Sequence, residues 1–248
     1  MNSYNDFAAV YDRLTVNVDY SQRAACYDFL IQANRKERGI LLDLACGTGS
    51  MSFEFARMGY DVIGIDGSEE MLSIAMNKKI DSNNHSVIFL CQQMQELDLY
   101  GTVDVTVCAL DSLNHLINPH DLQETFRRVS LFTNPGGLFL FDVNTVYKHR
   151  EILANNTFIY DEPGVYCIWQ NTLIDPFLVQ IDLDLFIECE KGIYRRGTEC
   201  FLERAYPDET IRFLLKKAGF AVIEIYDEDG RNSPRKNSER VIYLAQKN

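Results

Sequence analysis

The sequence has no uninterrupted apolar run that approaches the length of a membrane-spanning helix, so we expect no transmembrane segment and no membrane partner. The N-terminal stretch MNSYNDFAAVYDRL has neither a basic start nor a continuous apolar segment, which predicts that it is not a signal peptide. Positive charge is scarce. The formal net charge is −12, which argues against broad electrostatic binding to nucleic acid or to an anionic membrane. RNA bound by a local basic patch stays open.

Paired cysteines are also missing. The seven cysteines include no CxxC pair and no disulfide-like spacing, and their number is odd. This usage is typical of reduced thiols, so we expect a cytoplasmic protein, and we predict no metal site. Cys46, Cys91 and Cys108 fall within or beside apolar runs, where cysteine packs as a small hydrophobic residue.

Strand-like and helix-like segments alternate through the first part of the chain. Its 248 residues, 46% of them hydrophobic, suit one large α/β domain with an insertion. The predicted strands are Ile40–Leu44, Asp61–Asp66, Val87–Cys91, Val103–Leu110 and Leu138–Val143, and the predicted helices include Ser21–Lys36 and Pro119–Phe132. This alternation is typical of a parallel sheet covered by helices on both faces.

The pattern changes after Asp142. The segment that leads to the predicted helix Pro207–Ala218 is far longer than a connection between a strand and a helix needs. Apolar and polar residues alternate from Val179 to Glu188, which predicts a half-buried antiparallel strand. Tyr166–Leu173 and Ile193–Leu202 are predicted to be its neighbours. We therefore predict a small inserted antiparallel sheet.

The C-terminal segments Phe220–Tyr226 and Arg240–Ala245 are also predicted strands. The polar loop between them has no helical periodicity and barely allows a parallel crossover, so an antiparallel hairpin is predicted. The expected fold is therefore α/β, with a Rossmann-like, mostly parallel seven-stranded sheet that includes a C-terminal antiparallel hairpin strand. We expect residues 1–150 and 205–248 to form this domain and residues 151–204 to form the inserted antiparallel β subdomain.

The strongest functional signal is the stretch Leu41–Ser50, LLDLACGTGS. An apolar strand ends in an acid, a glycine loop follows, and an amphipathic helix begins directly after it, so backbone N–H groups can approach a nucleotide-like ligand. A dinucleotide fingerprint needs a third glycine where this chain has Ser52. The order Asp-x-Ala-Cys-Gly-Thr-Gly instead resembles the first motif of class I S-adenosylmethionine (AdoMet)-dependent methyltransferases.

Two further segments, Gly64–Leu72 and Gly136–Asp142, resemble successive motifs of the same family. The chain is most similar to small bacterial members that begin with Tyr-x-x-Phe-Ala-x-x-Tyr-Asp, here Tyr4 to Asp12, and that carry a β-insertion after the fifth strand. The resemblance covers Tyr4 to Asp142 well and the last part of the chain more loosely. It implies that AdoMet is the cofactor and that its methyl group is moved to an acceptor by in-line displacement.

Several residues are expected to contact the cofactor. Gly47 and Gly49 lack side chains where the backbone must touch the ligand. Asp43 can accept hydrogen bonds from the ammonium group of the cofactor, or it can cap the next helix or loop. Asp66 ends the second strand, where a carboxylate can accept both ribose hydroxyls. A nicotinamide-dependent oxidoreductase would show the same loop and acid, and that alternative stays open.

The resemblance adds further contacts to this set. It implies cofactor contacts for Tyr11, Ala45, Cys46, Gly67, Met71, Met94 and Leu110. For Tyr11 the alternative is an aromatic helix face that packs on the core. The family commonly has Asp-Met after the third strand, where the acid binds the adenine amino group, but this chain has Gln93-Met94. Gln93 can accept the same hydrogen bond without a charge. Its presence is the only hint of a non-catalytic, cofactor-binding or partner-binding protein.

Asp111 and His115 follow the fourth strand and are the candidates for proton transfer, although His115 can equally be a loop or capping residue. The acceptor is expected to be a small molecule because the chain is acidic, while RNA or protein substrates stay open. The insertion contains aromatic residues that suit a lid, a substrate wall or a homodimer contact: Tyr160, Tyr166, Trp169, Phe177, Phe186, Tyr194 and Phe201. The basic cluster Arg231, Arg235, Lys236 and Arg240 is predicted to be a solvated loop, with an anionic acceptor as the alternative.

Overall fold

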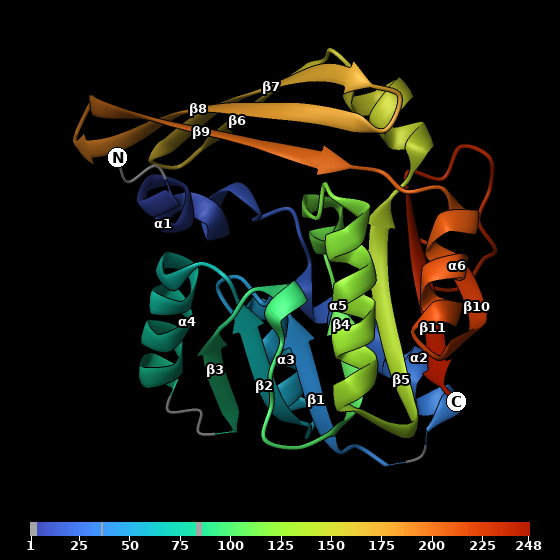
Figure 1. The fold of residues 1–248 in the computed structure, drawn as a ribbon. Coiled ribbons are helices and arrows are strands. Elements are labelled where there is room, and N and C mark those ends of the chain that lie inside the picture. The colour runs from blue at the N-terminus through green and yellow to red at the C-terminus, as the bar shows by residue number, and fades with distance from the viewer. Residues whose placement is uncertain (1–3, 36, 83–85) are drawn as a thin grey trace.

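The fold was analysed in a computed structural model, which describes residues 4–35, 37–82 and 86–248. Figure 1 shows a larger sheet with helices on both faces, and a smaller sheet that lies across the carboxyl ends of its central strands. The N-terminal helix α1, Tyr4–Leu14, lies beneath the smaller sheet. None of the helices in the described part of the chain combines the length and the hydropathy that a membrane span needs.

Seven strands form the larger sheet, in the order β10-β11-β5-β4-β1-β2-β3. Their bounds are β1 Ile40–Leu44, β2 Asp61–Asp66, β3 Val87–Cys91, β4 Val103–Cys108, β5 Thr133–Asn144, β10 Phe220–Asp227 and β11 Arg240–Lys247. The pairs among β1 to β5 are parallel, whereas β11 runs antiparallel to both β5 and β10. The predicted fold class is therefore confirmed, including the C-terminal hairpin.

The helices that cover this sheet are α2 Tyr20–Asn34, α3 Ser50–Arg57, α4 Glu69–Ser82, α5 Pro119–Phe132 and α6 Asp208–Lys217. Their ends follow from capping chemistry. Asn118 accepts a hydrogen bond from the backbone N–H of His120, and proline occupies the first position of α5. Lys36, at the end of the first predicted helix, lies outside the described residues.

Two hydrophobic clusters pack against the two faces of the sheet because successive residues of a strand point to opposite sides. In β5, Phe139 and Phe141 belong to the cluster that includes Phe126 of α5. Leu138 and Leu140 belong to the other cluster, with Tyr27 of α2. A buried core on both faces fixes the sheet and therefore the positions at which its strands end.

The inserted segment forms a four-stranded antiparallel sheet, β6 Thr157–Glu162, β7 Val165–Asp175, β8 Leu178–Glu190 and β9 Ile193–Arg204. The alternation in β8 buries Val179 through Ile187 on one face, as predicted, and Val10 of α1 joins the same cluster. A short helical segment, η3 Lys148–Leu153, precedes the sheet. Neither η3 nor a separate strand at β6 was predicted.

Candidate active site

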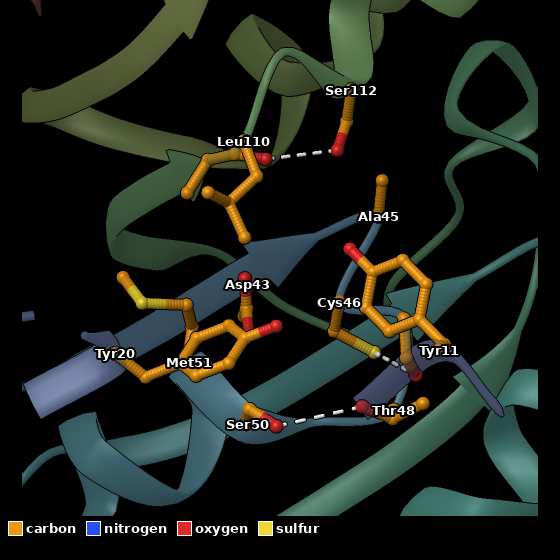
Figure 2. Close-up of a pocket in the computed structure, with 12 residues that line it drawn as sticks. Tyr11, Tyr20, Asp43, Ala45, Cys46, Thr48, Ser50, Met51, Leu110 and Ser112 are labelled. Carbon is orange, nitrogen blue, oxygen red and sulfur yellow. Dashed lines mark hydrogen bonds between the residues drawn. The ribbon is translucent and has the colours of Figure 1, made fainter. Parts of the chain in front are cut away.

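A cavity of about 840 Å³ lies between the carboxyl ends of the large sheet and the inserted sheet. This volume falls within the range of small-molecule sites, which is about 300–1,000 Å³. A narrow cleft of about 30 Å³ lies beside the glycine loop, between Asp43 and Tyr11 among other residues. Figure 2 shows the Tyr11 ring beside the loop that carries Ala45 and Cys46, with Leu110 and Ser112 across the cleft.

The loop between β1 and α3 has three residues with left-handed backbone angles, Ala45 (φ 60°), Gly47 (φ 54°) and Gly49 (φ 77°). A Cβ added to Gly47 would meet no atom within 4 Å, so this residue faces open space. A Cβ on Gly49 would lie 2.8 Å from Cζ of Phe89, and Gly49 lines neither cavity. Gly47 therefore leaves room for a ligand, whereas Gly49 permits close packing of the loop on β3.

Two acids at strand ends flank this loop. Asp66 accepts hydrogen bonds from the backbone N–H groups of Gly47 (2.8 Å) and Ser68 (2.9 Å), and burial raises its pKa. Asp43 is buried and accepts a 2.5 Å hydrogen bond from the hydroxyl of Ser52. Burial, with a smaller contribution from the nearby Asp66, raises the pKa of Asp43 to about 7. The serine that replaces the third glycine thus holds one of the predicted cofactor ligands.

The end of the cavity beside Asp66 is lined by Gly67, Met71, Gln93 and Met94. A Cβ on Gly67 would lie 2.5 Å from Nε2 of Gln93, so the glutamine side chain lies directly on the backbone of Gly67. Met71 is buried on α4, whereas Gln93 is exposed. Two methionine side chains and one exposed amide therefore lie at this end of the cavity, beside Asp66.

The N-terminal helix is tied to the glycine loop by charge and hydrogen bonds. Asp12 accepts a 2.7 Å hydrogen bond from the hydroxyl of Thr48 and forms a 2.6 Å ion pair with Lys78. Lys78 also donates to the hydroxyls of Thr48 and Ser50, each at 3.0 Å. Because Tyr11 precedes Asp12, its ring lines both the cavity and the cleft. Burial raises the pKa of the Tyr11 hydroxyl, which stays neutral.

A second left-handed turn follows β4, with Leu110 at φ 59° and Asp111 at φ 54°. The fully buried carboxylate of Asp142 holds it by accepting the backbone N–H of Leu110 at 2.9 Å and that of Asp111 at 2.7 Å. Tyr27 donates its hydroxyl to Asp142 at 2.7 Å. Arg240 pairs with Asp142 at 3.1 Å and with Asp111 at 3.0 Å.

The prediction that Arg240 lies in a solvated loop is wrong, because its side chain is only 10% exposed and joins two carboxylates. Asp111 also accepts a hydrogen bond from the side-chain amide of Asn144. Burial by itself raises the pKa of Asp111, but the positive charges of Arg240 and then Lys148 hold that pKa below its usual value. Asp111 is therefore ionised and already paired.

The inserted sheet contributes a further acid, Glu203 on β9, which is 4% exposed and lines the cavity. Its Oε1 lies 3.9 Å from Nε2 of His115, its Oε2 lies 3.8 Å from Nε2 of His149, and Asn144 donates to Oε2 at 3.4 Å. Burial, and then the charge of Asp111, raise the pKa of Glu203 to about 8. Burial lowers the pKa of His149 to about 4, so that imidazole is neutral.

Comparison with known proteins assigns this arrangement to a family. A family model described as a methyltransferase domain matches residues 41–137. A protein of Bacillus subtilis (strain 168) with the name "Putative methyltransferase YqeM" is 36% identical over 246 residues, which cover 98% of this chain and 97% of YqeM. A crystal structure of an S-adenosylmethionine-dependent methyltransferase from Clostridium acetobutylicum ATCC 824 is 33% identical, covers 99% of each chain and gives a TM-score of 0.89. The chain belongs to the S-adenosylmethionine-dependent methyltransferases.

The methyltransferase is also similar to a relative with a stated acceptor. A glycine/sarcosine N-methyltransferase of Halorhodospira halochloris is 33% identical over 236 residues, which cover 93% of this chain and 84% of that protein. The predicted reaction class and cofactor are confirmed by these comparisons, which do not favour the nicotinamide-dependent alternative.

Most of the predicted site residues of the methyltransferase come together around the two cavities. Those that line one or both are Tyr11, Asp43, Ala45, Cys46, Gly47, Asp66, Gly67, Met71, Gln93, Met94, Leu110, Asp111 and His115. Gly49 is the exception. Asp142 and Glu203 were missed. A signal for Asp142 existed, since it lies near the carboxyl end of an apolar strand as Asp43 and Asp66 do. Glu203 had only its alternation with Glu199 and Phe201 along β9.

Proposed function

We propose that this methyltransferase binds AdoMet at the glycine loop and transfers its methyl group to a small molecule held beneath the inserted sheet. The observation that carries the proposal is the continuity of one cavity from Asp66, at the end of β2, to Glu203 on β9. A cofactor bound at the first end would present its reactive group toward the second.

The residues present fit AdoMet. The open space beside Gly47 leaves room for the ligand at the loop. Asp66 is held in place by two backbone N–H groups and retains acceptor capacity for ribose hydroxyls. Asp43 has no ion-pair partner within the described ranges, so an ammonium group would neutralise a buried carboxylate. Gln93, Met71 and Met94 suit a flat, mostly apolar ring with a polar edge.

When bound, AdoMet supplies an electrophilic methyl group on a sulfonium sulfur. The protein has to align the acceptor and exclude water, and alignment alone can correspond to effective molarities of about 10⁵ M or more. The turn at Leu110 and Asp111 is suited to alignment, because Asp142 holds both backbone N–H groups. Helix α1 and the inserted sheet lie over the cavity, which restricts access of bulk solvent.

A small acceptor is supported by the size and the charge of the site. The cavity volume suits a metabolite together with a nucleoside cofactor. The net charge of −12 disfavours RNA. The N-methyltransferase of Halorhodospira halochloris, similar over 93% of this chain, is named for the small substrates glycine and sarcosine.

Two measurements test the proposal. Titration calorimetry with S-adenosylhomocysteine (AdoHcy) should give one site per chain, and NADH should give no binding. Incubation of the enzyme with methyl-labelled AdoMet and a desalted cell extract, supplemented with its own small-molecule fraction, should place the label in that fraction. Absence of AdoHcy binding at millimolar ligand would contradict the cofactor site, and label confined to RNA or protein would contradict the small acceptor.

A further inference from the structure

The inserted sheet presents acids and aromatic rings to the acceptor end of the cavity. Glu199, Phe201 and Glu203 alternate along β9 and therefore share one face, and all three line the cavity. Both acids are buried, at 5% and 4% exposed. Tyr160 and Trp169 line the same cavity, with their ring centroids 6.1 Å apart. Carboxylates and aromatic faces together form a site that attracts a cation.

Glu203 is the acid with capacity left for a ligand. Its Oε1 accepts no hydrogen bond from any described residue, and the nearest basic nitrogen is Nε2 of His115 at 3.9 Å. Because Glu203 lines the cavity, a donor that enters the cavity can hydrogen-bond to this oxygen. A ligand with a positively charged N–H group would supply both a hydrogen-bond donor and a counter-charge to this carboxylate.

The cations that face Glu203 are engaged elsewhere. Arg240 pairs with Asp111 and Asp142, and Lys148 donates to Oδ1 of Asn144 at 3.0 Å. The remaining titratable groups that face Glu203 are the carboxyl groups of Asp111 and Glu199 and the imidazoles of His115 and His149. Among the described residues, the basic groups within 4 Å of the Glu203 carboxylate are therefore the imidazoles of His115 and His149.

We propose that the acceptor is a primary or secondary amine that enters as an ammonium ion, and that Glu203 receives the proton that the amine must lose. The inference rests on the proposed function and adds the substrate class and a proton acceptor. The apolar and aromatic side chains around Glu203, which include Leu183 and Phe201, suit an amine carried on an apolar or ring-shaped body.

The proton and electron balance requires such a group. An ammonium nitrogen has no lone pair, so one N–H bond must break and its proton pass to Oε1 of Glu203 before the nitrogen can attack. The lone pair then forms the N–C bond to the transferred methyl as the C–S bond breaks and its electron pair stays on sulfur. The methylated product is a cationic ammonium ion. When the methylated ammonium ion leaves, Glu203 keeps the proton and is again the neutral acid of the ligand-free site. The one proton released per turnover is therefore the proton that Glu203 loses when the substrate ammonium ion binds, and His115, whose side chain is 46% exposed, offers it a route to solvent.

The single tryptophan of the chain provides a binding readout that does not depend on turnover. Because Trp169 lines the cavity, its fluorescence should change when a ligand enters. With AdoHcy bound, we expect benzylamine to quench Trp169 and to bind at least tenfold more tightly than benzyl alcohol or benzoate, which have the same body. Equal or tighter binding of benzyl alcohol or benzoate would overturn the proposal.

Proton linkage gives the second readout. Near pH 7 free benzylamine is an ammonium ion, and Glu203 of the ligand-free site is a neutral acid. In the complex, one of these two protons is lost, because an ammonium ion pairs with an ionised carboxylate. Binding should therefore release about one proton to the buffer. Calorimetry in two buffers of different ionisation enthalpy measures this number, which should fall toward zero as the pH rises from 7 to about 9 and Glu203 of the ligand-free site ionises. Binding that exchanges no proton at pH 7 would overturn the proposal.

The substitution Glu203→Gln separates charge from shape. It should weaken benzylamine binding at least tenfold and leave AdoHcy binding within twofold, while Glu190→Gln, at an exposed site on β8, should change neither. Unchanged benzylamine affinity in E203Q would overturn the inference. If E203Q fails to fold, the wild-type comparison of amine, alcohol and acid still decides. Loss of AdoHcy binding by the wild type would instead refute the proposed function, so the two failures are distinguishable.

Discussion

The two walls of the cavity are built in different ways. The wall at the carboxyl ends of the large sheet is made by short local segments, in which left-handed residues and backbone N–H groups fix Asp66 and the turn at Asp111. The wall from the inserted sheet is made by side chains of β9 whose partners lie far away in the sequence, such as Asn144 for Glu203. The first wall suits a nucleoside cofactor. Side chains of the second wall can change to fit another acceptor without altering the cofactor-binding wall.

Removal of the carboxylate that supports the first wall should have the largest effect. Asp142→Ala removes the buried acceptor of the Tyr27 hydroxyl and of two backbone N–H groups, and one of the two carboxylates that pair with Arg240. We expect a loss of about 3–5 kcal/mol in the free energy of unfolding, measured by urea denaturation. Asp98→Ala, at an exposed position, should change it by no more than about 0.5 kcal/mol. A small effect of Asp142→Ala would mean that the turn does not depend on this acid.

The cofactor end of the first wall is tested by Asp66→Ala. Loss of the acceptor for the ribose hydroxyls should weaken AdoHcy binding by about 1–3 kcal/mol, as measured by calorimetry. Asp61→Ala, at the exposed start of the same strand, serves as the matched control and should bind AdoHcy like the wild type. Equal affinities for the two variants would show that Asp66 makes no contact with the ligand.

A pH profile tests the ammonium end of the cofactor. Burial raises the pKa of Asp43 to about 7, so the free protein favours the neutral acid, and the stability that this contributes is lost as the pH rises from about 4 through 7. The ammonium group of AdoHcy should bind the ionised carboxylate of Asp43. AdoHcy affinity should therefore fall about tenfold per pH unit as the pH drops below 7. Asp43→Asn should flatten this profile, and an unchanged slope in that variant would assign the titration to another group.

A pair of glycine substitutions gives the smallest expected effect and the most specific one. Gly47 (φ 54°) and Gly136 (φ 74°) both have left-handed angles and open space where a Cβ would project. Alanine at either position should cost about 1 kcal/mol of stability. Only Gly47→Ala should also weaken AdoHcy binding, because only Gly47 lines the cavity. Similar AdoHcy affinity in both variants would contradict the role of the loop.

The same division explains what the sequence could predict. The strand ends, the glycine loop and Asp66 follow from local spacing and periodicity, so the fold and most of the first wall were accessible. Arg240 was assigned to a solvated loop because its partner Asp111 lies 129 positions away, and no local pattern reports that contact. Glu203 was missed because an acid in an alternating strand is usually solvent-facing. Its burial depends on how the inserted sheet lies over the large one.

The central claim is that the glycine loop and Asp66 hold the nucleoside of AdoMet at one end of the cavity, with its reactive group toward β9. A crystal structure with AdoHcy bound tests it most directly. We expect both ribose hydroxyls within hydrogen-bonding distance of Asp66, the amino group near Asp43, and the sulfur facing the space beneath Glu203. A cavity without AdoHcy, or a ribose that points away from Asp66, would contradict the account.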